Sequence, residues 1–139
     1  MMVILSFTVF LAEKATYATP EMFGAKGDGL TDDTLAVQSA IDSGNCFISK
    51  KYLTSNLVIA NSTITGTGTI ITDGITLKNN ANITSITLKC KTDTTTIFTI
   101  SNENINYANL GIYIDNIFIL GYAKDLNNPE LFIDFQKTS

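Results

Sequence analysis

Three carboxylates, Asp28, Asp32 and Asp33, lie close together around a glycine-rich turn. Paired carboxylates carry the general acid and base work of glycoside hydrolysis, so this cluster invites a catalytic interpretation. Two of the three are adjacent at the start of a predicted helix, where their side chains diverge. There, Thr31 or Asp32 can accept an N–H from the first turn, and the helix dipole favours carboxylates. We therefore expect these residues to cap the helix and brace the turn rather than to catalyse.

A tight turn followed by one short helix must position these carboxylates. The turn holds Gly24, Gly27 and Gly29 within six residues, and glycine serves where the backbone needs a positive φ or a close approach. The helix is expected at about residues 32–43, with a stop at Ser43–Gly44. Its apolar positions recur at i, i+3 and i+4 and should form one buried face: Val37, Ala40 and Ile41. Such a helix cannot build a core alone, so it should cover the open end of a β-solenoid.

The segment Phe23–Asp42, with Thr19–Met22 before it, resembles the N-terminal signature of the pectate-lyase superfamily of right-handed β-helices. That superfamily includes polygalacturonase-like and rhamnogalacturonase-like enzymes and many bacteriophage tailspikes. The resemblance covers about residues 19–44 directly. It implies an all-β, right-handed parallel β-helix with a short N-terminal capping α-helix. It also implies an end-cap role for the motif, with the active site on later coils. The motif residues are Phe23, Gly24, Gly27, Asp28, Gly29, Thr31, Asp32, Asp33 and Thr34.

Short strands separated by turn residues are predicted after residue 42, a pattern typical of an all-β repeat. They are Cys46–Ile48, Tyr52–Thr54, Asn56–Ala60, Ser62–Thr65, Thr69–Thr72, Ile75–Lys78, Ile83–Cys90, Thr95–Ile100, Gly111–Ile114, Asn116–Gly121 and Leu131–Phe135. Leu53, Ile75, Ile97 and Ile119 recur with a constant period of 22, which predicts three to four coils of that length. The segment 85–88 aligns better with 116–119, at an offset of 31, so we expect an inserted loop after residue 101.

The two cysteines, Cys46 and Cys90, are separated by two of these periods. They would therefore stand two rungs apart on one face, at about 9–10 Å between Cα atoms. A disulfide needs less than about 7 Å. The spacing therefore predicts two free, buried thiols that pack as small hydrophobes.

The composition of the chain argues against several classes of function. The formal charge is −4 and no basic run is present, which argues against nucleic acid as a partner. All nine basic residues are lysines, and histidine and arginine are absent. Polygalacturonase-like enzymes carry Gly-His-Gly and Arg-Ile-Lys signatures, which this chain cannot match. Pectate lyases hold calcium with carboxylates beside a basic residue, but the aspartates and lysines here form no such cluster. We predict no metal and no cofactor, and the catalytic residues stay unknown.

Two further sets of residues are candidate sites. Asp93 and Asp115, one period apart, could stack as a charged pair, but we expect two turn residues facing water. Three tyrosines in or beside the inserted loop could stack on sugar rings, since binding residues concentrate on loops. Partial burial at coil corners is the alternative for these glycan-contact candidates, which are Tyr107, Tyr113 and Tyr122.

The chain is expected to divide into an apolar segment, 1–18, and a β-helix domain, 19–139, with its cap at 19–45 and coils at 46–139. Residues 1–12 are too few to span a bilayer, which takes about 20. Thr16–Ala18 offers a cleavage site, yet no Lys or Arg precedes the apolar run, so a signal peptide and a docking strand both stay open. The last predicted strand has no cap after it, which predicts a truncated relative, a piece of a longer protein or assembly with another chain.

Function follows mainly from the resemblance. It implies a polysaccharide partner, a cell-surface glycan or a pectin-like polymer, together with a homotrimer and a place in a virion tail or outside the cell. The first hypothesis is the capped beginning of a phage or prophage tailspike-like protein, not catalytically complete alone. The alternatives are an active polysaccharide lyase or glycoside hydrolase of the same superfamily, and a structural or adhesin-like module without glycan chemistry.

Overall fold

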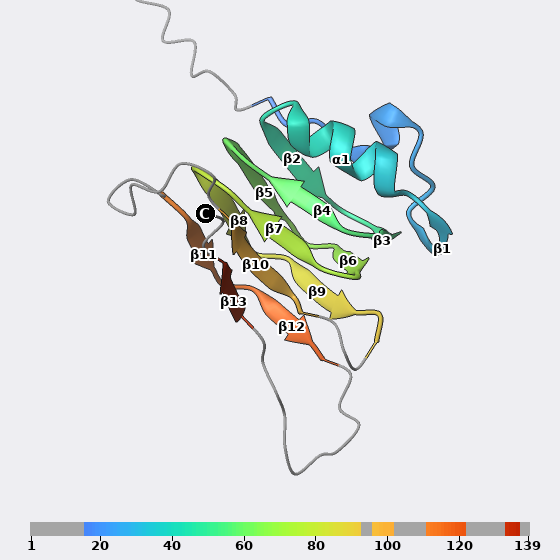
Figure 1. Ribbon diagram of the computed structural model, residues 1–139. Coiled ribbons are helices and arrows are strands. Elements are labelled where there is room, and N and C mark those ends of the chain that lie inside the picture. Colours follow the sequence, from blue (N-terminus) through green and yellow to red (C-terminus); the bar gives the residue numbers. More distant parts are fainter. Residues whose placement is uncertain (1–15, 93–95, 102–110, 122–132, 137–139) are drawn as a thin grey trace, which may run out of the picture.

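Three parallel β-sheets form the sides of a stacked coil in the computed structural model, which describes residues 16–92, 96–101, 111–121 and 133–136 (Figure 1). Sheet A contains β2 (Asn45–Ile48), β5 (Ser62–Gly66), β8 (Ala81–Thr84) and β11 (Tyr113–Asp115). Sheet B contains β1 (Asp28–Asp32), β3 (Lys51–Leu53), β6 (Thr69–Thr72), β9 (Thr87–Cys90) and β12 (Phe118–Leu120). Sheet C contains β4 (Leu57–Ile59), β7 (Ile75–Leu77), β10 (Phe98–Ser101) and β13 (Ile133–Gln136). The predicted parallel β-helix is confirmed.

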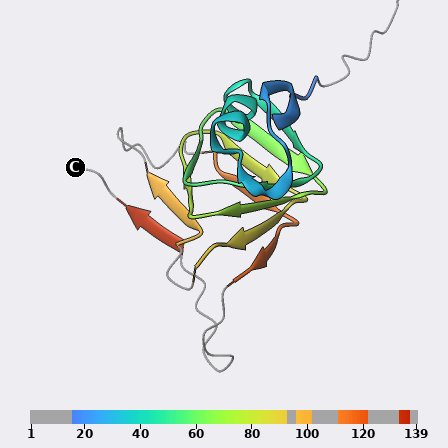
Figure 2. The same ribbon diagram turned by 90° about the vertical axis from the view of Figure 1, so that its right-hand side faces the viewer.

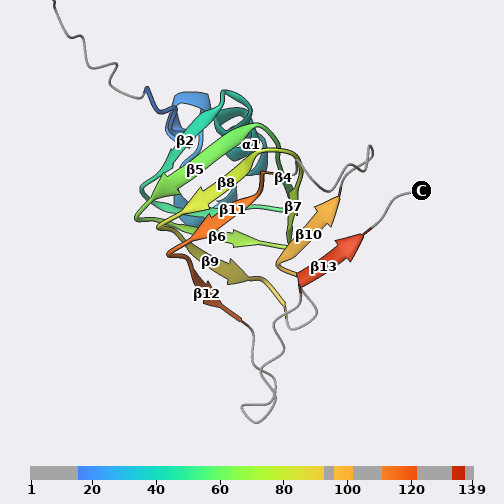
Figure 3. The ribbon, with the colours of Figure 1, turned by 90° about the vertical axis from the view of Figure 1, so that its left-hand side faces the viewer.

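The chain passes from sheet A to sheet B to sheet C in each coil, so every strand pairs in parallel with its equivalent in the next coil. Figure 3 shows the four strands of sheet A stacked in order from β2 to β11. The short helices η1 (Pro20–Phe23) and α1 (Thr34–Asp42) lie at one end of the stack (Figure 2). The predicted capping helix is thus present, beginning slightly later and ending slightly earlier than expected.

The coil length differs from the prediction. Tyr52 pairs with Ile70 and Ile70 pairs with Leu88, so these coils repeat with a period of 18, which is also the separation of Asp73 and Lys91. The expected period of 22 is therefore wrong. Isoleucine is so frequent in this chain that apolar matches at that spacing arise by chance.

Later coils are longer than the first ones. Ile75 pairs with Phe98, and Leu88 pairs with Ile119. The predicted offset of 31 is confirmed by this second pairing and by the contact between Asn116 and Ser85, which have that same separation. The loop expected to account for the offset, at 102–109, lies outside the described residues.

Corners with left-handed backbone make the short coil feasible. Asn61 and Asn80 have φ of 51° and 54° where sheet C passes to sheet A. Ser85 and Asn116 have φ of 59° and 47° where sheet A passes to sheet B. Asparagine is one of the few non-glycine residues that tolerates this region. The predicted single strand Ile83–Cys90 is wrong, because the corner at Ser85 divides it into β8 and β9.

A continuous apolar core fills the coil. Strand residues alternate between buried and partly exposed, and the inward positions of the middle coils, such as Ile64, Ile70 and Leu77, are fully buried. The three apolar positions predicted on one helix face are also fully buried: Val37, Ala40 and Ile41. The helix therefore extends the core beyond the first coil.

Both cysteines are free and buried, as predicted. The geometric reason given for that prediction is wrong, however, because Cys46 lies on sheet A and Cys90 lies on sheet B. Burial, with a smaller contribution from the charge of Glu21, raises the pKa of the Cys46 thiol to about 12. Burial also raises the pKa of the Cys90 thiol. Both thiols are thereby kept in the unreactive protonated form at neutral pH.

Candidate functional site

The carboxylates of the glycine-rich motif all bind nearby backbone. Asp28 begins β1, a strand that the sequence did not predict, and its side chain accepts the N–H of Leu30 (2.8 Å) and of Thr31 (2.7 Å) and the hydroxyl of Thr31 (2.8 Å). This loop forms a bulge, because β1 pairs with β3 only at Asp28 and Asp32. The N–H of Thr31, then that of Leu30 and the Thr31 hydroxyl, lower the pKa of Asp28 to about 2.

Asp33 binds the backbone of the preceding turn, whereas the adjacent Asp32 binds the start of α1. It is only 4% exposed and accepts the N–H of Lys26 and that of Gly27, each at 2.9 Å, so it closes the turn on itself. Gly27 has a φ of 65°, and a Cβ there would approach the Lys50 side chain to 2.7 Å. The neighbouring Asp32 accepts the N–H and the hydroxyl of Thr34, the first residue of α1. All three carboxylates thus accept hydrogen bonds from donors within the motif or at the start of α1.

A second polar cluster, which sequence reasoning missed, ties η1 to the first coil. The buried Tyr52 donates its hydroxyl to Glu21 at 2.7 Å, and Lys50 pairs with the same carboxylate at 3.3 Å. Burial raises the pKa of Glu21, but the bonds from Tyr52 and Lys50 lower it by more, so the net shift is downward. Burial and the bond to Glu21 raise the pKa of Tyr52. A tyrosine among apolar strand residues gave no sequence signal for this contact.

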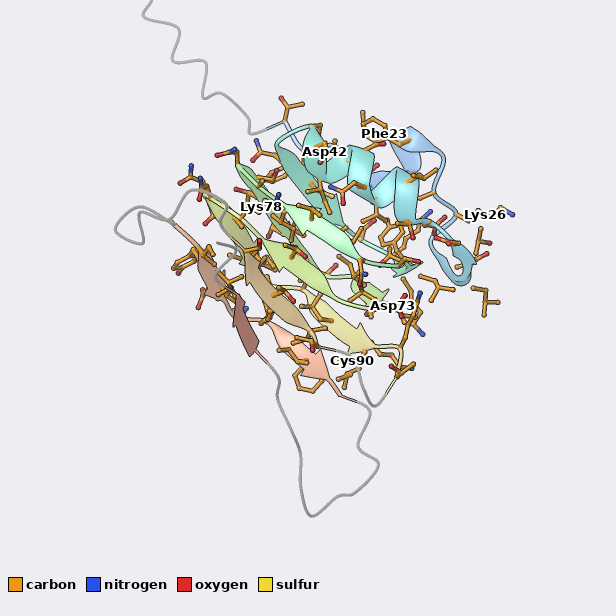
Figure 4. All side chains as sticks on the ribbon, viewed as in Figure 1. Phe23, Lys26, Asp42, Asp73, Lys78 and Cys90 are labelled. Atoms are coloured by element: carbon orange, nitrogen blue, oxygen red, sulfur yellow. The ribbon has the colours of Figure 1, made fainter. Side chains whose placement is uncertain are left out.

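The motif borders a hollow of about 440 Å³ between η1, β1 and α1. Phe23 and Leu35 supply its apolar wall, and its polar wall is formed by Thr31, Asp32, Asp33 and Thr34. Figure 4 shows Phe23 and Lys26 beside the helices, whereas Asp73 lies away from them on the sheets. The two carboxylates that line this hollow, Asp32 and Asp33, already accept hydrogen bonds from backbone and hydroxyl donors.

The outer face of sheet A carries the polar groups best arranged to contact a ligand. Its outward positions form two rows across the coils: Asn45, Thr63, Asn82 and Tyr113 in one, and Phe47, Thr65, Thr84 and Asp115 in the other. The rows are held in register by the strand pairing, and the Asn82 amide lies 3.5 Å from the Thr63 hydroxyl. A shallow hollow of about 410 Å³ lies on this face, lined by Gly44, Asn45, Asn61, Ser62, Thr63, Asn80 and Asn82.

Aromatic rings stand at both ends of this sheet A outer face. Tyr113, one of the three predicted glycan contacts, is 56% exposed on β11 and continues the row of Asn82. At the other end, Tyr17 meets Phe47 edge to face, with ring centroids 6.1 Å apart. Tyr107 and Tyr122 lie outside the described residues. The pair at Tyr17 was not predicted, because the register of sheet A was needed to place it.

Two of the remaining candidate carboxylates lie on different sides of the coil, Asp73 after β6 of sheet B and Asp115 on β11 of sheet A. Asp73 pairs with Lys91 at 2.9 Å across a corner. Asp115 stands opposite Thr84 on the sheet A outer face, while Asp93 lies outside the described residues. No group of three or more His, Cys, Asp or Glu side chains in the described part of the chain could hold a metal ion. Within the same ranges, no helix has the length and apolar character needed to cross a membrane.

Parts of the chain are similar in sequence to capsule depolymerases of Klebsiella phages. Depolymerase 1, capsule K30/K69-specific, of phage K5-2 is 45% identical over 71 residues, which are 47% of this chain and 9% of that protein. The K30/K69-specific depolymerase of phage K64-1 is 56% identical over 48 residues, 31% of this chain and 6% of that protein. Depolymerase 1, capsule KN3-specific, of phage KN3-1 is 67% identical over 33 residues, 24% of this chain and 4% of that protein.

The matched part of the chain thus spans less than a tenth of each of these relatives. No family model matches the chain, and no solved structure matches it. Partial homology to Klebsiella phage capsule depolymerases is therefore established, whereas membership of the pectate-lyase superfamily stays a prediction from the motif.

Proposed function

We propose that this chain is the capped beginning of a phage or prophage tailspike-like protein that engages capsular polysaccharide. The observation that carries the proposal is the sequence similarity to three phage depolymerases whose names specify a capsule type. The parallel β-helix supports it, because a stack of sheets offers a long outer face with side chains in regular rows. In the intact protein, the virion tail is the place that this proposal assigns to the chain.

The sheet A outer face is the surface that we propose for the polysaccharide. Its amide and hydroxyl groups both donate and accept hydrogen bonds, as sugar hydroxyls require. The exposed ring of Tyr113 offers an apolar face with a polar tip, which suits stacking on the C–H side of a pyranose. Asp115 is the only charged residue among the eight outward positions, so recognition there would rest on hydrogen bonds and stacking.

Binding without cleavage is the activity that we propose for the isolated chain. The motif carboxylates are engaged by backbone and hydroxyl donors, and the sequence has no histidine or arginine. A glycosidase needs two carboxyl groups facing each other across the scissile bond. The catalytic machinery of the intact protein would then lie on other coils.

The test is affinity electrophoresis of the purified chain in gels containing K30 or K69 capsular polysaccharide. We expect retardation that Tyr113→Ala weakens about threefold to tenfold, since one aromatic contact is worth about 0.5–1.5 kcal/mol. Phe118→Ala is the matched control, because Phe118 is also an exposed aromatic of the last coil, 63% exposed, but lies on sheet B. Absence of retardation, or equal loss in both variants, would contradict the proposed surface.

An active polysaccharide-cleaving enzyme is the second candidate, favoured by the depolymerase names of the relatives. Incubation with the same polysaccharides distinguishes the two. Steady release of unsaturated uronides, followed by absorbance, or of new reducing ends would contradict the non-catalytic proposal. Sedimentation of the same sample tests the homotrimer that the tailspike interpretation implies.

A further inference from the structure

A polar hollow lies where sheet C passes to sheet A, at the corners that precede β5 and β8. Its volume is about 410 Å³, and four asparagines, Asn45, Asn61, Asn80 and Asn82, line it together with a serine, a threonine and a glycine. We call it the asparagine hollow. All of its lining side chains carry hydrogen-bonding groups. It therefore differs in chemistry from the hollow at the cap, whose lining includes the aromatic ring of Phe23.

The strand corners fix two of these asparagines before any ligand arrives. Asn61 and Asn80 have φ of 51° and 54°, in the left-handed region that asparagine tolerates better than most residues. They stand one coil apart, and the Asn80 amide donates to the side-chain oxygen of Asn61 at 3.0 Å. On the strands that follow, the Asn82 amide lies 3.5 Å from the Thr63 hydroxyl. Side chains that are already ordered lose little freedom on binding, which favours a ligand of matching polarity.

The side chains of the asparagine hollow suit a neutral sugar better than an acidic one. A carboxamide carries a donor and an acceptor, so it can bond two neighbouring hydroxyl groups at once. A carboxylated sugar brings a negative charge whose loss of water is costly unless a cation balances it. None of the described residues that line the hollow is charged, and Lys78, two positions before Asn80, is not one of them. The one charge among the eight outward positions of sheet A is the carboxylate of Asp115, which would repel a second anion.

We infer that the asparagine hollow binds one neutral sugar unit and discriminates against a carboxylated unit of the same shape. The inference rests on the proposed function, since it takes the sheet A outer face as the carbohydrate-binding surface and names the class of sugar bound at one position on it. The amides of Asn61, Asn80 and Asn82 would hold the sugar hydroxyls. Tyr113, which pairs with Asn82 on the next coil, would offer its ring to the neighbouring unit.

The test follows the side-chain amide signals of the asparagines by two-dimensional NMR while methyl glycosides are added to the full chain. The probes are the methyl glycosides of glucose, galactose and mannose, each paired with the methyl glycoside of its uronic acid. We expect at least one neutral probe to shift the signals of Asn61, Asn80 and Asn82, and its carboxylated counterpart to bind about threefold to tenfold more weakly. Absence of shifts with all three neutral probes, or equal or tighter binding of the carboxylated ones, would overturn the inference.

Asn80→Gly removes the central amide of the hollow and keeps a residue suited to left-handed backbone. We expect it to weaken binding of the neutral probe about fivefold to tenfold, because hydrogen bonds to the sugar are lost. Asn116→Gly is the matched control. Asn116 is also left-handed, with φ of 47°, and its amide lies 3.4 Å from the Ser85 hydroxyl of the preceding coil, but its corner joins sheets A and B. Equal weakening in the two variants would overturn the inference, and backbone amide signals elsewhere in the spectrum show whether each variant is folded.

Lys78 is the cation to test as a competing explanation. It follows β7, and its N–H donates to the Ile59 carbonyl of sheet C. Lys78→Ala should leave the affinity for every probe unchanged. Selective loss of the carboxylated probes in this variant would show that a cation serves the hollow, and would overturn the inference.

These measurements use single sugars, so their outcome is separate from that of gel electrophoresis with polysaccharide. Retardation in the gel without shifts of the asparagine amides would leave the proposed function standing and overturn the inference. Amide shifts without retardation would support the hollow as a sugar site and contradict the proposed polysaccharide surface.

Discussion

The two ends of the coil stack present the same kind of rung to different surroundings. At the capped end, α1 covers the first coil and its inward residues, with Val37, Ala40 and Ile41, are completely buried. At the other end of the described stack, formed by β11, β12 and β13 and here called the open end, Ile114 in an equivalent inward position is 36% exposed. The difference shows that an inward-facing isoleucine is stabilising only to the extent that another layer lies beyond it.

Closing a β-helix end also requires that strand edges be satisfied, and an apolar lid does not do this by itself. The capped end uses three unrelated devices: an extended segment at Ala18, the bulged strand β1 and the side chain of Gln38. The carboxylates of the motif then fix the loop that joins these devices. The carboxylates that look catalytic in the sequence make hydrogen bonds within the cap, and their structural role there stays a prediction.

The sharpest way to break the comparison is to truncate one isoleucine at each end. Ile41→Ala removes a fully buried side chain from α1 and should destabilise the chain by about 2–5 kcal/mol, because a cavity remains. Ile114→Ala removes a partly exposed one and should cost less than about 1 kcal/mol. Urea unfolding followed by circular dichroism measures both. Equal losses at the two ends would show that the open end is in fact covered.

The buried carboxylate of the cap comes next in expected size. Asp33→Ala leaves the N–H groups of Lys26 and Gly27 without their acceptor and should cost about 2 kcal/mol. Asp32→Ala is the matched control, since Asp32 is adjacent but exposed, and we expect a smaller loss. If the two variants lost the same stability, the closed turn would not be what holds the cap together.

Much of this architecture could be predicted from the sequence, for identifiable physical reasons. The cap helix could be predicted from the motif, because helix-start residues and apolar residues at helical spacing are local signals. The gaps between the predicted strands contain Asn61 and Asn80, which lie at corners whose left-handed backbone restricts the residue type. The coil length could not be predicted in the same way. Leu53 pairs with Ile71 in the structure, but Ile75 is an equally apolar partner for Leu53 in the sequence and implies a longer coil.

The role of Gln38 could not be predicted either. Its partner Val58 is distant in the sequence and lies on a strand with no distinguishing feature. A contact of this kind depends on where the helix sits over the first coil, and that placement follows from the packing of the whole cap rather than from any local pattern.

Gln38 gives the third prediction, which tests whether edge satisfaction matters separately from burial. Gln38→Ala removes two hydrogen bonds to Val58 at a solvent-accessible edge and should cost about 1 kcal/mol. Amide exchange at Val58 should speed up, while exchange in β8 should be unchanged. Ser39→Ala, the next position on the same helix, is the control for effects on helix propensity. Unaltered exchange at Val58 in the Gln38 variant would mean that this edge is protected by something else.

The smallest effect is expected at the exposed carboxylate that holds the bulge of β1. Hydrogen bonds from Thr31 and Leu30 lower the pKa of Asp28 to about 2 from its ordinary value of 3.8. A carboxyl group whose pKa is depressed by folding stabilises the native state above its unfolded value and loses that contribution as pH falls through its folded value. The melting temperatures of wild type and Asp28→Asn should therefore differ at pH 5 and converge between about pH 4 and pH 2. Thr31→Val removes only the hydroxyl donor to Asp28. At pH 5, its melting temperature should therefore differ from that of the wild type by less than that of Asp28→Asn does. A difference that persisted undiminished at pH 2 would mean that Asp28 acts at the cap through its shape and not through its charge.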